Sequence, residues 1–383
     1  MAKIINLNIF KQFFKSSQSG GIILLICVCI SLLIANSPAK AGFDNFLATK
    51  VGFEIANYSL LTWINDALMA IFFLLVGLEI KRELVEGELS SIKNAALPVI
   101  AALGGMLVPA VIYFAFNNGT EAAKGWGIPM ATDIAFALAI IAMLGKNVPA
   151  SLKIFLAALA IVDDLGAIIV IAIFYTNQIH FEYLGLAAII VILLSMMNYF
   201  GVKNPVFYLI PGIFLWYFVH HSGIHATIAG VLLAFTIPTN STSTESPLEK
   251  LEHALTVPVN YLIMPIFALA NTNITFQKQM FGALVSPLGL GIIIGLFIGK
   301  TIGVTCFSFI AVKLKWASLP TGTNWRHIFG LAMLAGIGFT MSIFIALQSF
   351  NNPMHIAEAK FAILTASILS GIIGYLYLKN LKP

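Results

Sequence analysis

Long apolar stretches separated by short polar connections run along the chain from residue 18 to residue 378. About 20 predominantly apolar residues are enough for a helix to cross the hydrocarbon core of a bilayer. The pattern therefore predicts an all-α integral membrane protein with about twelve such segments. We place them near residues 18–36, 60–80, 95–116, 123–143, 152–175, 183–200, 205–219, 223–237, 254–273, 287–312, 327–349 and 357–378.

The connections between these segments are short, so no soluble domain is inserted and residues 1–383 form a single polytopic domain. The longest polar linker, 239–249, is rich in serine and threonine. In the first external loop, Val51, Phe53 and Ile55 alternate with polar or small residues, which is a period typical of a strand. This alternation favours a small β-hairpin in that loop.

The composition supports a membrane protein and excludes other classes. Of the 383 residues, 59% are apolar and 10% are charged, and the mean hydropathy is +0.95. A soluble domain is about 45–50% apolar and about 25% charged. A chain of this size cannot hide so much apolar surface in its own interior, so a soluble enzyme and a disordered protein are both excluded.

The positive charges are scattered and indicate orientation in the membrane. The net charge is +5, but no face concentrates the cations, which excludes nucleic-acid binding. Fifteen of the 21 Lys and Arg residues fall in one set of alternate loops, five fall in the other set, and Lys300 lies inside a segment. By the positive-inside rule, both termini are cytoplasmic, which requires an even number of spans.

The first segment has a second interpretation as a secretory signal. Lys11 and Lys15 precede an apolar run that ends in Ser-Pro-Ala at 37–39, but the membrane pattern continues after it, which favours a retained span. The cysteines indicate no further chemistry, because all three lie in apolar runs without metal-ligand spacing and their number is odd. We expect no disulfide, no structural zinc and no cofactor.

The fifth segment contains two adjacent carboxylates, Asp163 and Asp164, near its middle. Each ionised carboxylate at the centre of a membrane helix costs about 2.5–3.5 kcal/mol, so the pair needs protons or a cation to compensate it. Neighbouring helical residues point about 100° apart, so one carboxylate can face a cavity while the other contacts a partner. An Asp pair at a helix end is the alternative, but apolar residues flank the pair on both sides.

The fourth segment contains an interruption before a third carboxylate. Pro129 lacks a backbone donor and disfavours helix at the residue before it, and it stands just ahead of Thr132 and Asp133. We expect freed carbonyls and the Thr132 hydroxyl to face a cation, and Asp133 to balance the positive ends of half-helices. Alternatively, a short helix begins here with Asp133 in its first turn.

The eleventh segment resembles the fourth. Glycines at 336 and 338 precede Thr340, and Thr340 and Phe344 repeat Thr132 and Phe136 at a constant offset of 208 residues. Paired interruptions in two halves of a transporter sequence are the best pointer to its binding site. The repeat predicts that the two interrupted segments act together.

Lys300 is the cation left inside the tenth segment. Gly291, Gly295, Gly299 and Gly303 recur every four residues and form a smooth ridge, where another helix can approach closely. A snorkelling lysine at a helix end is the alternative, but apolar residues extend on both sides of this position. We expect Lys300 to pair with Asp163 or Asp164, for function rather than stability.

Two charged groups at the cytoplasmic ends of the second and ninth segments are candidates for pH regulation, because clusters of opposite charge repack as they titrate. A solvated loop face is an equal alternative. His225, at the external start of the eighth segment, is either a sensor or a surface histidine. The candidates are Glu79, Arg82, Glu83, Lys250, Glu252, His253 and His225.

These residues together resemble the NhaA-type sodium/proton antiporters of bacterial inner membranes. The resemblance covers nearly the whole chain, from about Gly20 to the last segment. Five strings carry it: WINDALMA at 63–70, FFLLVGLE at 72–79, ATDIAFAL at 131–138, DDLGA at 163–167 and GIGFTMS at 336–342.

The resemblance implies twelve helices with inverted repeats in helices 3–5 and 10–12, and two discontinuous helices, 4 and 11, that cross at mid-membrane. It implies a core bundle at about 94–175 and 287–380 beside panel helices at about 18–85 and 183–273. A homodimer would form partly through the external hairpin near 45–61.

By the same resemblance, Asp163 and Asp164 form the ion site with Thr132, and Lys300 is their partner. Members of the family use the proton gradient to expel Na⁺ or Li⁺, exchange more than one H⁺ per ion and shut down at acid pH. Some positions depart from the usual pattern: Thr256 stands where relatives carry histidine, and Glu249 stands where a base is frequent. These departures leave the pH set-point open.

Two other classes fit the sequence less well. Intramembrane aspartyl proteases need a Gly-x-Gly-Asp string and intramembrane prenyl transferases need Asp-x-x-Asp motifs, and the chain has neither. The flux of a channel would not depend on the exchange of protons for sodium. We therefore expect a transporter and no enzyme.

Overall fold

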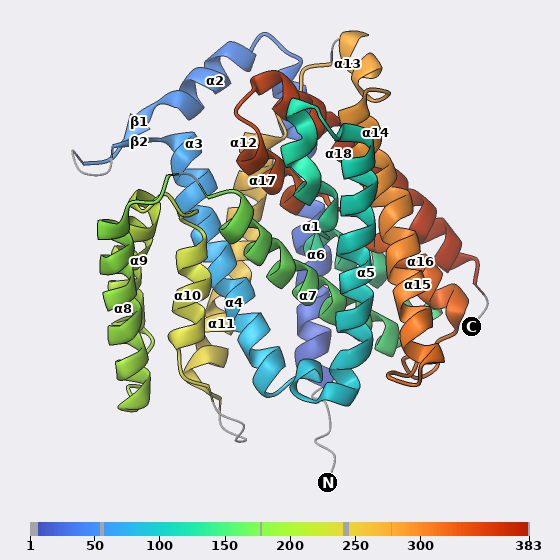
Figure 1. Cartoon of the computed structure of the whole chain (residues 1–383), viewed down its shortest axis with the longest axis horizontal. Coiled ribbons are helices and arrows are strands. Elements are labelled where there is room, and N and C mark those ends of the chain that lie inside the picture. The colour runs from blue at the N-terminus through green and yellow to red at the C-terminus, as the bar shows by residue number, and fades with distance from the viewer. Residues whose placement is uncertain (1–6, 54–56, 177, 240–244, 277, 382–383) are drawn as a thin grey trace.

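The protein is a bundle of helices with one very small sheet, seen in a computed structural model (Figure 1). The structure describes residues 7–53, 57–176, 178–239, 245–276 and 278–381. The fold class predicted from the sequence, an all-α membrane protein, is confirmed.

The elements of the first half are α1 (Leu7–Ala35), α2 (Lys40–Ala48), β1 (Lys50–Val51), β2 (Tyr58–Ser59), α3 (Leu60–Thr62), the π-helix η2 (Trp63–Leu68), α4 (Met69–Val85), η3 (Glu88–Ser90), α5 (Ile92–Asn117), the 3₁₀-helix η4 (Glu121–Met130), α6 (Ile134–Met143), η5 (Gly145–Asn147) and α7 (Ala150–Phe174).

The elements of the second half are α8 (Phe181–Tyr199), α9 (Val206–His221), α10 (Ile228–Thr236), α11 (Pro247–Pro258), the π-helix η6 (Val259–Ile263), α12 (Met264–Asn271), α13 (Lys278–Ala283), α14 (Pro287–Ile294), the π-helix η7 (Gly295–Gly299), α15 (Lys300–Lys313), α16 (Trp325–Ala335), α17 (Phe339–Ser349) and α18 (Pro353–Lys379).

Each of the twelve predicted segments coincides with a helix or a run of helices. Within the described residues, seven helices are long and apolar enough to cross a membrane, and three bent pairs raise this number to ten. The other two segments are shorter, because α9 has 16 residues and α10 has nine. At about 1.5 Å per residue, α10 covers less than half of a bilayer core.

The start predicted for the eighth segment, residue 223, is wrong, because helix α10 begins more than one helical turn later. Gly223 has φ +86°, a left-handed conformation that glycine adopts readily, and the helix begins only at Ile228. His225 therefore lies in the turn before α10 rather than in the helix.

The hairpin predicted for the first loop is present, although Ile55 lies outside the described residues. Strands β1 and β2 pair antiparallel, with Lys50 opposite Ser59 and Val51 opposite Tyr58. Helix α2 precedes the hairpin and is bent by 112° from the span before it. It was not expected from the sequence. This helix and the hairpin extend across the top of the bundle in Figure 1.

The close approach predicted for the glycine ridge is present, and the helix that packs there is α5. A Cβ atom on Gly303 would collide with the backbone of Gly104 in α5, and one on Gly295 would meet Pro129 of η4 at 2.9 Å. Because side chains are absent at this contact, the backbones of α5 and α15 approach closely. The ridge thus places Lys300, the next residue after Gly299, against the interior of the bundle.

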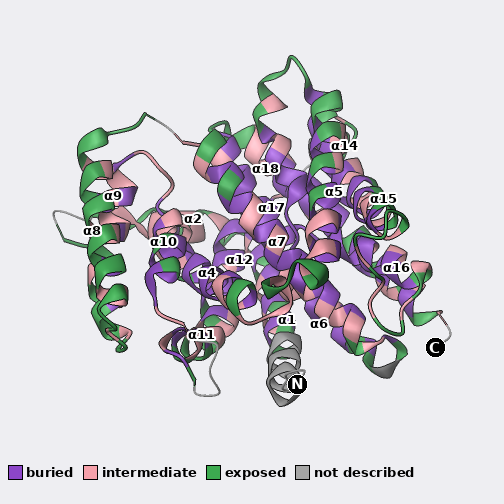
Figure 2. Ribbon diagram, turned by 60° about the horizontal axis from the view of Figure 1, so that its bottom comes forward, coloured by how far each residue is buried: buried purple, intermediate pink, exposed green. Residues whose placement is uncertain are grey.

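Burial follows the centre of the bundle (Figure 2). Helix α7 is buried along much of its length, whereas α8 buries only Ala187 and Leu194. The exposed side chains of α8 include Ile189 and Ile192, which are apolar. An apolar surface of this kind is expected where lipid is the solvent. The division into core bundle and panel stays a prediction.

Candidate functional site

Two helical spans are broken near their middles, and these breaks form the candidate site. The first break lies between η4 and α6, which are bent by 41°, and the second lies between α16 and α17, which are bent by 46°. Pro129 is in the last turn of η4, so the interruption follows the proline by one residue. The predicted interruptions of the fourth and eleventh segments are both confirmed.

The breaks contact each other directly. The amide of Asp133 donates to the carbonyl of Ile337 at 2.6 Å, and the Ser342 hydroxyl donates to the carbonyl of Ile128 at 2.8 Å. Backbone groups freed in one broken helix are therefore satisfied by the other. Such irregular backbone is tolerated at membrane depth only where protein or a cavity surrounds it.

Asp133 caps two helices at once. One of its carboxylate oxygens accepts from the amide of Phe136 at 3.0 Å, at the N-terminus of α6. The other accepts from the amide of Thr340 at 3.0 Å and from the hydroxyl of that residue, at the N-terminus of α17. A negative charge at two positive helix ends is stabilising, so the role predicted for Asp133 fits this geometry.

Asp163 forms an ion pair with Lys300, and both side chains are fully buried. The same carboxylate oxygen lies 2.7 Å from the Thr132 hydroxyl, which is also 2.9 Å from the carbonyl of Ala335. A hydroxyl has one proton, so Thr132 can donate to only one of these acceptors at a time. Asp163 therefore joins the lysine of α15 to both broken helices.

The Lys300 ammonium also donates to the carbonyl of Met130, at the end of η4. The snorkelling alternative is wrong, because the side chain is 0% exposed and lies in the bundle interior. Lys300 follows directly after the π-helix η7, and such wide turns often occur at functional sites. The lysine thus satisfies a carbonyl that the broken helix has freed.

Asp164 is 1% exposed, and no hydrogen bond to its carboxylate occurs within the described part of the chain. One oxygen of Asp163 and one oxygen of Asp164 are buried without a partner there. If both aspartates are ionised, Lys300 compensates only one of the two charges. A buried and uncompensated carboxylate is costly, so the pair favours the binding of one further cation or proton.

The charged residues predicted at the second and ninth segments come together only in part. Arg82 Nε contacts both carboxylate oxygens of Glu252, at 3.1 and 2.9 Å, and its guanidinium lies 2.9 Å from Glu83. His253 instead pairs with Glu245 at 2.9 Å, on an exposed surface. His253 and Glu252 are adjacent on α11 and point about 100° apart, so only Glu252 contacts Arg82. The role of these residues in pH regulation stays a prediction.

Three other candidates lie apart from that ion-pair group. Lys250 is exposed on α11, and Glu79 lines a separate small pocket. The His225 Nε2 atom is hydrogen bonded to the Gln348 side chain, and its ring packs edge-on against Phe344. His225 is therefore half-buried against α17 rather than free on the surface.

Comparison with known proteins agrees with this geometry. The sequence profile of the family described as Na⁺/H⁺ antiporter 1 matches residues 11–378. The chain belongs to this family. It is 61% identical to a protein of Flavobacterium johnsoniae named Na(+)/H(+) antiporter NhaA 2, over 99% of this chain and 94% of that protein. It is 50% identical to the Na(+)/H(+) antiporter NhaA of Escherichia coli, over 97% of this chain and 98% of that protein.

Family membership makes this chain a multi-pass transporter, and the resemblance found from the sequence is confirmed. Freed carbonyls were expected from the sequence at the first interruption, and the structure identifies the backbone acceptors of the site as those of Met130, Ala335 and Ile337. Their position at the interrupted turns was the available signal. The sequence analysis missed Ser342, although that residue lies in the GIGFTMS string.

Proposed function

We propose that this chain is a secondary antiporter that expels Na⁺ from the cytoplasm in exchange for external H⁺. Its family and the names of its relatives support the exchange reaction. One observation carries the proposal: Asp163 and Asp164 are buried with a single lysine where two broken helices meet. A receptor would not need uncompensated acids at membrane depth.

Na⁺ and H⁺ compete for the aspartate pair in this proposal. The unpartnered oxygens of Asp163 and Asp164, with the Thr132 hydroxyl, supply the hard oxygen donors that an alkali cation prefers. Either Na⁺ or protons cancel the charge that Lys300 leaves uncompensated. Because both cannot bind together without excess positive charge, each expels the other.

Alternating access follows from rocking of the core bundle, at about 94–175 and 287–380, against the panel helices at about 18–85 and 183–273. The close contact of the two breaks supports this, because Asp133 and Thr340 would move as one unit. The site would then open first to the cytoplasm and afterwards to the outside. No cofactor takes part in the cycle.

Several finer properties belong to the same proposal. Li⁺ would replace Na⁺, and more than one H⁺ per cation would make exchange electrogenic. Regulation by pH would involve the ion pairs of Arg82 with Glu83 and Glu252, which join α4 to α11. The protein would lie in the inner membrane with both termini cytoplasmic, and would form a homodimer through the β1–β2 hairpin.

Reconstitution of the purified chain in proteoliposomes tests the reaction. An imposed pH gradient should collapse on addition of Na⁺ or Li⁺ but not K⁺, and the rate should fall at acid pH. Liposomes without protein are the control. Passage of Na⁺ without counterflow of protons would indicate a channel and contradict the proposal.

A further inference from the structure

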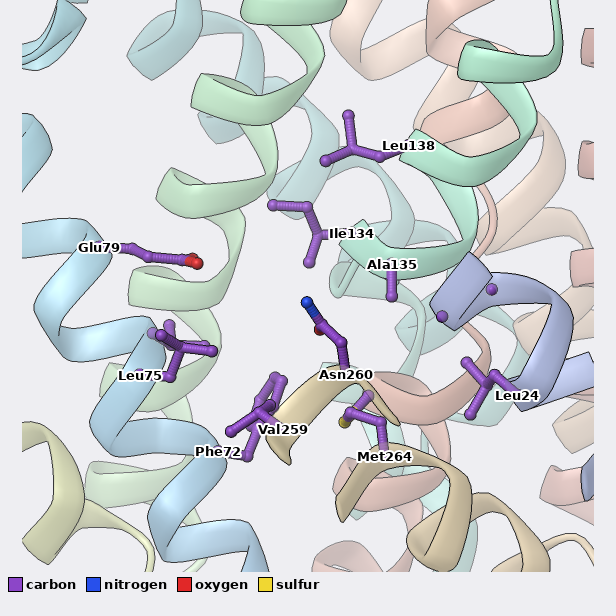
Figure 3. A pocket seen from close by; sticks show the side chains of 13 residues that line it. Leu24, Phe72, Leu75, Glu79, Ile134, Ala135, Leu138, Val259, Asn260 and Met264 are labelled. Carbon is purple, nitrogen blue, oxygen red and sulfur yellow. The ribbon is translucent and has the colours of Figure 1, made fainter. Parts of the chain in front are cut away.

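A small pocket lies between α1, α4, α6 and η6 (Figure 3). It is next to the first turns of α6, the helix that follows the first break. Its volume is about 30 Å³, which is room for about two water molecules. Most of its wall is apolar, from side chains such as Leu24, Phe72 and Met264. Two polar side chains line it, Glu79 from α4 and Asn260 from η6.

These two side chains point toward each other across the pocket (Figure 3). Neither Glu79 nor Asn260 has a side-chain hydrogen bond anywhere in the residues that the structure describes. An apolar pocket with a few convergent polar groups is the usual form of a ligand site. In the orientation drawn in Figure 3 the Asn260 amide turns its nitrogen toward Glu79, and rotation about the last side-chain bond would present the amide oxygen instead. A carboxylate and an amide oxygen on the same water-sized space are ligands for a hard cation.

The nearby arginine does not neutralise Glu79 by an ion pair. Arg82 is one turn further along α4, and its guanidinium is occupied by Glu83 and Glu252. Arg82 is therefore paired with two acids, and Glu79 has no ion pair within the described part of the chain. An unpaired carboxylate in apolar surroundings is costly, so Glu79 is stabilised by uptake of either a proton or a cation.

The backbone of η6 explains how Asn260 reaches the pocket. This wide turn lies between Pro258 and Pro265, neither of which can donate a backbone hydrogen bond. A π-turn inserts one extra residue and changes which side chains face inward. Close packing of α1 closes the other side, where a Cβ atom on Gly20 would lie 3.3 Å from the Asn260 carbonyl.

The pocket also lies next to the aspartate site. Ile134 and Ala135 line it, and they directly follow Asp133 in the first break. Glu79 and Asp164 are close enough for their negative charges to repel each other. A cation in the pocket would therefore interact electrostatically with the aspartate pair.

We propose that Glu79 and Asn260 form a second cation site, which a partly hydrated Na⁺ or Li⁺ occupies before it reaches Asp163 and Asp164. The inference rests on the proposed antiport function. The pocket volume leaves space for the ion and about one water, so the cation keeps part of its hydration shell. Asn260 adds a neutral oxygen and strengthens binding without a titratable group.

The test uses Asn260→Ala in proteoliposomes, with Na⁺ and Li⁺ as the probes. The apparent KM for both cations should rise about threefold to tenfold, the loss expected for one polar contact, with little change in the maximal rate. The pH profile should not move, because an amide does not titrate. Leu262→Ala is the matched control, since it shortens an exposed side chain of the same turn.

Asn260→Asp provides the opposite change and keeps the test informative if the alanine variant does not fold. It adds a charged oxygen, so the apparent KM should fall. An unchanged KM in either folded variant, or a change in maximal rate alone, overturns the second site. Absence of any Na⁺-dependent proton movement in the unmodified protein would instead overturn the antiport function itself.

Discussion

Asp133 and Thr340 are 207 residues apart in the chain, yet the amide and the hydroxyl of Thr340 both donate to one carboxylate oxygen of Asp133. The other oxygen of Asp133 caps α6. One side chain therefore ties the two broken spans together and balances the positive ends of both half-helices.

Substitution of Asp133 should destabilise the crossing of the broken helices. Asp133→Ala removes both caps and should lower the free energy of unfolding by about 1–3 kcal/mol. Asp133→Asn keeps one acceptor oxygen, and so one of the two caps, but loses the charge, so it should lie between the alanine variant and the unmodified protein. Thermal unfolding in detergent measures this order. Equal unfolding temperatures for all three proteins would show that the caps contribute nothing.

The ion pair of Lys300 and Asp163 should be costly to break from one side. Lys300→Met leaves Asp163 buried without its cation, and such a change typically costs about 3–5 kcal/mol. The double variant Lys300→Met with Asp163→Asn should recover much of this stability, because no unpaired charge remains. Chemical or thermal unfolding of all four proteins of the cycle measures the coupling.

That double variant should still be inactive in exchange, since the site has lost a carboxylate. Stability and transport would then be separated, as expected if the pair is kept for function. Additive effects of the two substitutions on stability would mean that the side chains do not interact.

The contact of α5 with α15 should tolerate no added side chain. Gly303→Leu forces the helix away from the Gly104 backbone, which has no side chain that could move aside, and should cost at least about 1–3 kcal/mol. Gly282→Ala is the control, because open space surrounds that position. Yield of folded protein and unfolding temperature measure the effect. Similar values for both variants would contradict the close approach.

The sequence was enough to find the spans, both interruptions and the buried charges, because apolar length and isolated acids have strong local signals. It did not decide whether Asp163 or Asp164 pairs with Lys300. The two positions point about 100° apart on α7, so the packing of α15 decides between them.

Contacts that depend on backbone geometry also could not be predicted from the sequence. The acceptors at Met130 and Ala335 become available only once the helices are broken at particular residues. The turn of α11 likewise places Glu252 on Arg82 and leaves His253 with Glu245, although the two residues are adjacent. Charge clustering in the sequence therefore does not decide which of these residues form ion pairs.

The central claim is that Asp163 and Asp164 hold either an alkali cation or protons. Everted membrane vesicles with Asp163→Asn, Asp164→Asn or the surface control Glu182→Gln test it most directly, by the Na⁺-induced collapse of a respiratory pH gradient. We predict that both aspartate variants lose this response and that the control keeps it. Full Na⁺-dependent collapse in both Asp163→Asn and Asp164→Asn would contradict the account.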